Sequence, residues 1–293
     1  MNSSPVVIEN VHSRGSAASA YAHLEKNNRE IVTDYYVPRP VTGEFESFAL
    51  KVFVRLNAKG IIFKNVSFAH SVIDGCYLRS CVFDSCNFTG CRFIGSNLHQ
   101  STFQDCKFDY ATFERCHIDD DILTTAAPRQ DNLRMRFARS LRMNYQQVGD
   151  AKAVNKAISL ELEATSRHLL ESWSSDSLYH RKKYPGLLRM AQFFHWVEFW
   201  VLHFVWGNGE SVLKLLRSIL IAIVMIAIYD AGSLSVQATI YDYWESLKLA
   251  PGIFLGTVVQ DHHSTAAAST IVATKLVALA LLTALLVKRF GRR

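Results

Sequence analysis

A period of five residues dominates the middle of the chain. Starting at Phe63, every fifth residue is bulky and apolar, and the series continues without a failure to Leu123. A second series lies two positions before the first, and from Ser71 onward its members are all small. An α-helix repeats about every 3.6 residues and a strand about every two, so neither element produces this pattern. The chain must instead turn a corner every five residues.

Four such corners close a square coil of about 20 residues, and successive coils stack about 4.8 Å apart. The stacking predicts that Phe63 lies under Phe83 and Phe103, because these residues occupy the same face of successive coils. The predicted core consists of one bulky residue per face: Phe63, Phe68, Ile73, Leu78, Phe83, Phe88, Phe93, Leu98, Phe103, Phe108, Phe113 and Ile118.

The pattern of a small residue, any residue, and then Leu or Phe, repeated in fives, resembles the pentapeptide-repeat family. The resemblance covers about residues 61–123 and implies a right-handed quadrilateral β-helix of about three coils. We assign this domain to residues 61–127. Residues 1–60 are expected to form an N-terminal tail and a cap, in which Glu44–Leu56 covers the first coil.

The cysteines all occupy the small inward positions of the repeat. A free cysteine packs as a small hydrophobic residue, and cysteines used as spacers indicate a reducing compartment. We therefore predict reduced, inert thiols, with a zinc site or a redox pair between stacked Cys86 and Cys106 as the alternatives. The six residues are Cys76, Cys81, Cys86, Cys91, Cys106 and Cys116.

The outward surface of the predicted coils carries balanced charge. Residues 61–118 contain five acidic and five basic side chains. Some soluble pentapeptide-repeat proteins mimic DNA through a long acidic surface, and a short, balanced surface disfavours that activity. We expect no nucleic-acid partner.

Residues 128–189 are predicted to form a cytoplasmic helical hairpin and a linker. From Asn132 the apolar period becomes helical, and Gly149-Asp150 provides the turn between two helices. Asp119–Asp121 at the solenoid end is interpreted as a solvated or helix-capping terminus, with a metal site as the alternative. Four arginines indicate a solvated face near anionic lipid or acidic groups, with nucleic acid as the alternative. They are Arg134, Arg136, Arg139 and Arg142.

Residues 190–293 are predicted to be an α-helical membrane domain with two spans, 212–229 and 266–287, each long enough to cross a bilayer. Residues 190–206 are rich in aromatic residues and predict an interfacial helix, with a third span as the alternative. Its predicted membrane anchors are Trp196, Trp200 and Trp206. Basic residues flank the spans on one side, which predicts a membrane protein with both termini cytoplasmic. The absence of a signal peptide at Met1 agrees with this orientation.

Between the spans, residues 240–256 are semi-apolar and contain Pro and Gly, which predicts a re-entrant loop formed by a short helix that enters and leaves the membrane from the same side. The order of repeats, hairpin, span, loop and span resembles bacterial pentapeptide-repeat proteins fused to a two-span ion-channel-like domain. The residues that carry this resemblance are Gly149-Asp150, Trp206–Glu210, Tyr243–Leu247 and Lys288–Arg293. The resemblance implies a homo-oligomer, a tetramer by analogy. A TVGYG-type potassium filter is absent, and APGIFLG stands near its place.

The candidate pore residues are Lys275, Pro251, Gly252 and Gly256. Lys275 lies inside the second predicted span, where a lysine is costly unless it faces water, a partner or an interface. One interpretation is a positive charge that lines the pore and repels cations. The other is snorkelling towards the outer headgroups.

We therefore predict a homo-oligomeric inner-membrane channel or pore whose cytoplasmic repeat domain assembles, senses or gates it. A role in stress response or phage defence would suit a small gated pore. The alternative is a membrane-tethered scaffold whose solenoid binds a protein partner without conducting ions. No nucleophile–base pair, phosphate loop or metal-ligand spacing is recognisable, so we expect no enzymatic activity, catalytic residue, metal or cofactor.

Overall fold

The computed structural model describes residues 29–43, 48–234 and 239–290 of the chain. The predicted N-terminal tail falls largely on residues 1–28, outside the described residues. The chain divides into two compact units, Met1–Glu171 and Ser172–Arg293. Each unit is described by itself.

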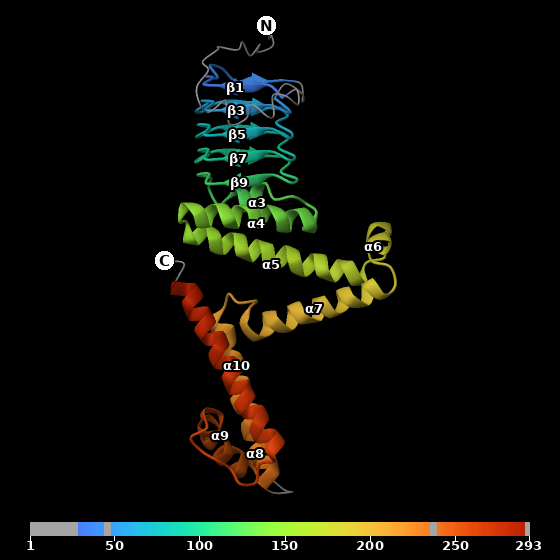
Figure 1. Ribbon diagram of the computed structural model, residues 1–293, viewed down its shortest axis with the longest axis vertical. Helices are drawn as coiled ribbons and strands as arrows, with labels where there is room; N and C mark the ends of the chain where they lie inside the picture. Colours follow the sequence, from blue (N-terminus) through green and yellow to red (C-terminus); the bar gives the residue numbers. More distant parts are fainter. Residues whose placement is uncertain (1–28, 44–47, 235–238, 291–293) are drawn as a thin grey trace. The chain divides into compact units, whose positions relative to one another are not determined.

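Short parallel strands build the first unit (Figure 1). They form a five-stranded sheet in the order β1-β3-β5-β7-β9 and a four-stranded sheet in the order β2-β4-β6-β8. Two ladders of isolated bridges make the remaining faces of the coil, one through Tyr77 and Asn97 and one through Asn87. The strands are β1 (Ile31–Thr33), β2 (Val41–Thr42), β3 (Val52–Val54), β4 (Ile62–Lys64), β5 (Val72–Asp74), β6 (Val82–Asp84), β7 (Arg92–Ile94), β8 (Thr102–Gln104) and β9 (Thr112–Glu114).

The solenoid has about four turns, so the predicted number of about three is wrong. The described part of the predicted cap, residues 48–56, belongs to a further turn of the solenoid. Its strand β3 pairs in parallel with β5 on one side and with β1 on the other. The five-residue period continues backwards from Phe63 through Ala58, Phe53 and Phe48, all buried. The small side chain of Ala58 hides this continuation from a search for bulky residues.

A left-handed residue turns each corner of the coil. Every fifth residue from Leu50 to Arg115 has a positive φ, whether or not it is glycine. At Gly90 (φ +66°) a Cβ would lie 2.5 Å from His70 Nδ1, so a larger residue there would have to displace the exposed His70 ring. The five-residue period is therefore set by the backbone as well as by the core, since one αL residue per face redirects the chain.

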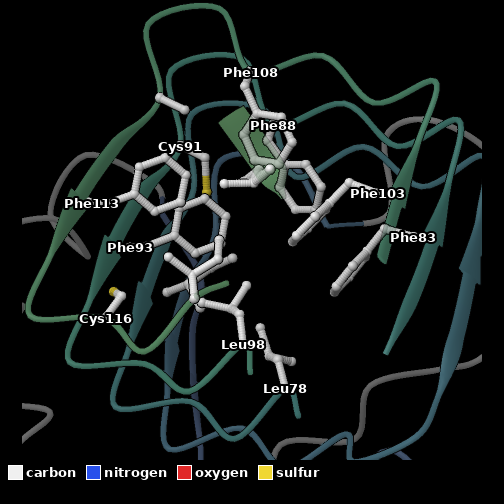
Figure 2. Packing of buried hydrophobic residues seen from close by; sticks show 14 of the residues in the cluster. Leu78, Phe83, Phe88, Cys91, Phe93, Leu98, Phe103, Phe108, Phe113 and Cys116 are labelled. Carbon is white, nitrogen blue, oxygen red and sulfur yellow. The ribbon is translucent and has the colours of Figure 1, made fainter. Parts of the chain in front are cut away.

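The stacked core has the predicted register. Phe63 pairs with Phe83, and their rings stack with centroids 5.1 Å apart and planes 10° apart. Phe88 stacks on Phe68 with a centroid distance of 5.1 Å. On its other side it stacks on Phe108 at 4.9 Å (Figure 2). All predicted core residues are buried, with exposed fractions of at most 8%. The inward series was therefore predicted correctly.

The small inward residues do more than save space. The hydroxyl of Ser71 donates to the carbonyl oxygen of Phe48 at 2.7 Å, and the hydroxyl of Ser101 donates to that of Leu78 at 2.6 Å. The thiol of Cys81 makes the equivalent contact with the Ala58 oxygen at 2.8 Å. In each case the acceptor lies 23 residues earlier in the chain. The hydroxyl or thiol of a small inward residue thus bonds one coil to the preceding coil.

The cysteines are free thiols, and burial changes their acidity. Burial raises the pKa of Cys76 from 9.0 to about 12, and it raises the pKa values of Cys81 and Cys116 to about 11. A thiol with a raised pKa stays protonated and unreactive near neutral pH, because the thiolate is the nucleophile.

We expect these thiols to make the solenoid sensitive to alkali. Their contribution to folding stability is complete below the unfolded-state pKa of about 8.5 and is lost as the pH rises through about 11–12. The urea midpoint of the first unit should therefore fall as the pH is raised above about 9. Replacing Cys76, Cys81 and Cys116 by serine, the residue found at equivalent positions, should flatten this pH dependence. An equal slope in the triple variant would contradict the assignment.

Helices close the C-terminal end of the solenoid (Figure 1). They are α3 (Ile122–Thr125), α4 (Asp131–Val148) and α5 (Ala151–Ser174), and Gly149 forms the turn of the hairpin with φ +79°. The helical hairpin was predicted. Its function as a cap was not predicted, although α4 supplies polar groups to the last coil. Asn144 is fully buried, accepts from the Cys116 N–H at 2.6 Å and donates to the Cys116 oxygen at 2.8 Å. The Ser140 hydroxyl accepts from the Phe113 N–H at 2.8 Å.

Charged groups suspected of other functions take part in this packing. Asp119 accepts from the Gln100 N–H at 2.6 Å, and Asp120 pairs with Lys156 at 2.6 Å. Arg139 and Arg142 both pair with Glu161, at 2.9 and 3.1 Å. These contacts give the two aspartates and the two arginines a structural role within the first unit.

The second unit is helical. It contains α6 (Leu178–Lys183), α7 (Leu187–Trp206), α8 (Val212–Leu234), α9 (Ile240–Leu255) and α10 (Thr265–Phe290). A small core joins Ile226 and Ala227 of α8, Ile253 and Phe254 of α9, and Ala278 of α10.

Candidate functional site

Two helices of the described residues are long and apolar enough to cross a membrane. The segments are Val212–Leu234 and Thr265–Lys288, and both have a mean hydropathy of 2.3 in their most apolar window. Only 17% and 11% of these windows are buried. A core helix of a soluble protein would be mostly buried, so both helices present apolar surface that the second unit does not cover.

The hydroxyl groups on α10 are bonded within the helix. Thr270, Thr274 and Thr283 each donate to the carbonyl oxygen four residues earlier, at 2.8–2.9 Å. Such internal bonds leave the hydroxyl hydrogen satisfied without water, as a lipid-facing helix requires. The surface of α10 is therefore less polar than its threonine content suggests.

The short helix predicted in the re-entrant segment is present as α9. Thr239 and Asp242 form a capping box, and the Thr239 N–H donates to Asp242 Oδ2 at 2.7 Å. Pro251 lies inside the helix, where it removes one backbone donor but does not end the helix. Gly256 ends it with φ +77°. The N–H groups of Thr257 and Val258 then donate to the Gly252 oxygen, at 2.9 and 3.3 Å, and the chain turns back.

Three of the four candidate pore residues come together at this turn. Lys275 Nζ donates to the Leu255 oxygen at 3.4 Å, and a Cβ on Gly256 would lie 3.2 Å from the same Nζ. Gly252 accepts the hydrogen bonds of the turn, while Pro251 is exposed on the last turn of α9. An ammonium at a helix C-terminus interacts favourably with the helix dipole. Lys275 is therefore held by α9, a contact that neither interpretation of the sequence anticipated.

The predicted interfacial helix is α7, none of whose residues is buried. Trp200 is 57% exposed. Trp196 is half-buried and packs against Trp173 with centroids 5.5 Å apart, and Trp206 is also half-buried. The predicted anchors therefore differ in exposure, and Trp200 is the one most open to its surroundings.

The glycine-rich connection between α7 and α8 is in contact with the end of α10. Gly207, Asn208 and Gly209 all have positive φ, which brings the chain sharply into α8. Lys288 near the end of α10 donates to the Gly209 oxygen at 2.9 Å and pairs with Glu210. These contacts hold the end of α10 beside the start of α8.

A cluster of titratable groups lies at the opposite end of α8. The carboxylate of Asp230 is fully buried, and its Oδ1 lies 2.9 Å from His262 Nε2 and 2.8 Å from His263 Nε2. Sequence reasoning missed this site because the histidines were treated as scattered. The signal in the sequence was an aspartate at the end of the first apolar segment and two consecutive histidines shortly before the second apolar segment.

Comparison with known proteins agrees with the repeat. Residues 58–125 match the family model described as pentapeptide repeat region, close to the predicted limits 61–123. The similar solved structures include two trypsin-treated variants of QnrB1, described as a plasmid-mediated fluoroquinolone resistance protein. Both are 13% identical over 31% of this chain, with TM-scores of 0.19 and 0.15. The matches span 64% and 54% of those chains, which is less than two thirds of their length. No curated protein matches.

Proposed function

We propose that this chain is an inner-membrane protein that assembles from several copies into an ion-conducting pore, with the pentapeptide-repeat unit on the cytoplasmic side. The observation that carries the proposal is the uncovered apolar surface of α8 and α10. Exposed residues on it include Leu220 at 62%, Met225 at 59% and Leu276 at 59%. In water this surface would aggregate, whereas in a bilayer it would contact lipid or a neighbouring subunit.

Two spans cannot enclose an aqueous path, so conduction needs several copies. A groove of about 480 Å³ between α8 and α10 supports a helix–helix contact between copies. Its lining includes Ala222, Ala273 and Ala278, and small residues of this kind allow helices to approach closely in membranes. A tetramer remains an analogy with two-span channels. By the same analogy, the solenoid would assemble, sense or gate the pore, and opening the pore would dissipate ion gradients during stress or phage infection.

Lys275 is the residue most able to set ion preference. A fixed positive charge beside a narrow path raises the barrier for cations, because repulsion is poorly screened where the dielectric constant is low. The Leu255 carbonyl accepts from its ammonium at the end of α9, where Gly256 has no side chain to displace it. The α9–α10 turn would then form the selective region in place of a potassium filter.

The test is current recording from the purified protein in planar bilayers. Lys275→Glu should move the reversal potential in a salt gradient towards cation preference, and Lys275→Leu should change the conductance. Lys152→Glu, the same charge change on exposed α5 of the first unit, should leave ion preference unchanged. Equal ion preference in all variants would show that Lys275 has only a structural contact with the end of α9.

Wild-type protein that inserts into the bilayer but never conducts would exclude the pore. The alternative function, a tethered scaffold whose solenoid binds a protein partner, would then be favoured.

A further inference from the structure

The environment of Asp230 is unusual for an aspartate in an apolar helix. Its side chain has an exposed fraction of 0%, and among the described residues no lysine or arginine pairs with it. Burying an unpaired carboxylate is costly, so groups that approach it must compensate its charge. The groups that approach it are the imidazoles of His262 and His263, from the turn that precedes α10.

Hydrogen bonds alone leave this arrangement incomplete. Both imidazoles approach the same oxygen, Oδ1, through their Nε2 atoms. The second oxygen, Oδ2, is buried and has no hydrogen-bond partner among the described residues. Two imidazoles crowded at one oxygen beside an unsatisfied one make poor use of a buried carboxylate. A single cation in place of the two protons would bind both nitrogens and Oδ1, with Oδ2 available as a further ligand.

The donor atoms are already spaced for such a cation. At metal–ligand distances of about 2.0–2.1 Å, neighbouring donors lie roughly 2.9 Å apart at a right angle and roughly 3.3 Å apart at a tetrahedral angle. The Asp230–His262 and Asp230–His263 distances are 2.9 and 2.8 Å, and the three donor atoms all lie within 4.8 Å of one another. Both Asp230–His distances match the right-angle spacing, and the imidazole nitrogens lie near enough for side-chain movement to bring all three donors onto one ion.

The donor types select the class of metal. Two imidazole nitrogens with one carboxylate suit zinc and neighbouring transition metals, whereas Mg²⁺ and Ca²⁺ prefer oxygen ligands. We propose that Asp230, His262 and His263 bind a zinc ion that joins the end of α8 to the start of α10. This site is independent of ion conduction.

The surroundings give the site both support and an entrance. The Tyr229 ring packs against His263 with centroids 5.2 Å apart, and its hydroxyl lies 3.5 Å from Ser264 Oγ. The His263 side chain is 4% exposed and that of His262 is 25% exposed. An ion would therefore enter past His262 and be held from within by His263 and Asp230.

The test uses full-length protein in detergent, freed of metal with a chelator and then titrated with Zn²⁺. We expect about one zinc per chain by elemental analysis after desalting, and His263→Gln should weaken zinc affinity at least about 100-fold. Cobalt in place of zinc should give visible d–d absorption that His263→Gln abolishes. His195→Gln, which removes an exposed imidazole of α7, should leave both results unchanged.

Zinc should also raise the melting temperature of the wild type but not that of His263→Gln. If that variant fails to fold, His262→Gln at the more exposed ligand serves the same comparison. Wild-type protein that retains no zinc, or variants that bind it as tightly as the wild type, would overturn the proposal and leave a hydrogen-bonded His–Asp cluster. Neither result depends on whether the protein conducts.

Discussion

Replacing Phe88 by aspartate should unfold the solenoid. Phe88 is fully buried and stacks between Phe68 and Phe108, with a further edge contact to Phe83 at 5.3 Å. The substitution removes a large core side chain and buries a charge without a partner. Together these effects should lower the free energy of unfolding by at least about 5 kcal/mol, comparable with the whole stability of many domains.

The matched control is the next residue. Thr89 is half-buried, and its hydroxyl bonds only to Asn87 Oδ1, at 2.7 Å. Thr89→Asp should therefore cost no more than about 1 kcal/mol. Urea unfolding followed by circular dichroism distinguishes the two variants. Equal midpoints for both would mean that the assigned inward register is wrong.

The second large effect is expected at the cap. Asn144→Leu should leave the N–H and carbonyl of Cys116 unpaired beneath α4, because the asparagine amide bonds to both. Each buried, unsatisfied backbone group costs about 1–3 kcal/mol, so we expect a loss of about 2–5 kcal/mol. The freed coil end should also promote self-association, since it exposes an unpaired edge.

Met143 provides the comparison for this variant. Its side chain is 52% exposed on the same turn of α4, so Met143→Leu should change the unfolding midpoint little. Urea unfolding gives the stability, and sedimentation gives the association state. If Asn144→Leu is as stable and monodisperse as Met143→Leu, α4 does not function as the end of the ladder.

The inward side of the solenoid was predictable because its constraint is local and periodic. One bulky residue in five must face the axis, so Phe83 and Phe88 can be placed without knowing anything else. The same reasoning failed before Phe63, where Ala58 fills an inward position with a small side chain. A search for bulky residues cannot detect an inward position that carries a small side chain.

The cap and the metal cluster were missed for a different reason. Asn144 is a polar residue on an amphipathic helix, and the sequence alone does not show that it faces a ladder end rather than water. Asp230 and His262 are 32 residues apart and meet only because α9 folds back between them. The short helix itself was predictable from its length and composition, and in the structure Pro251 lies inside α9, which ends at Gly256.

The ladder of Ser and Cys side chains that reach back 23 residues has a consequence for how this fold can change in length. Each coil bonds to the preceding and the following coil, so the stability of one coil does not depend on the total number of coils. Whole coils can therefore be duplicated or deleted as units, provided that the last one still presents the Cys116 backbone to Asn144. A change that is not a multiple of five residues would put an αL corner where a strand should be and a polar residue on the axis, and a change of five, ten or fifteen residues would move every later residue to a different face of the coil. The gene for such a protein is expected to tolerate insertions and deletions in blocks of one turn, while the terminal helix stays the same.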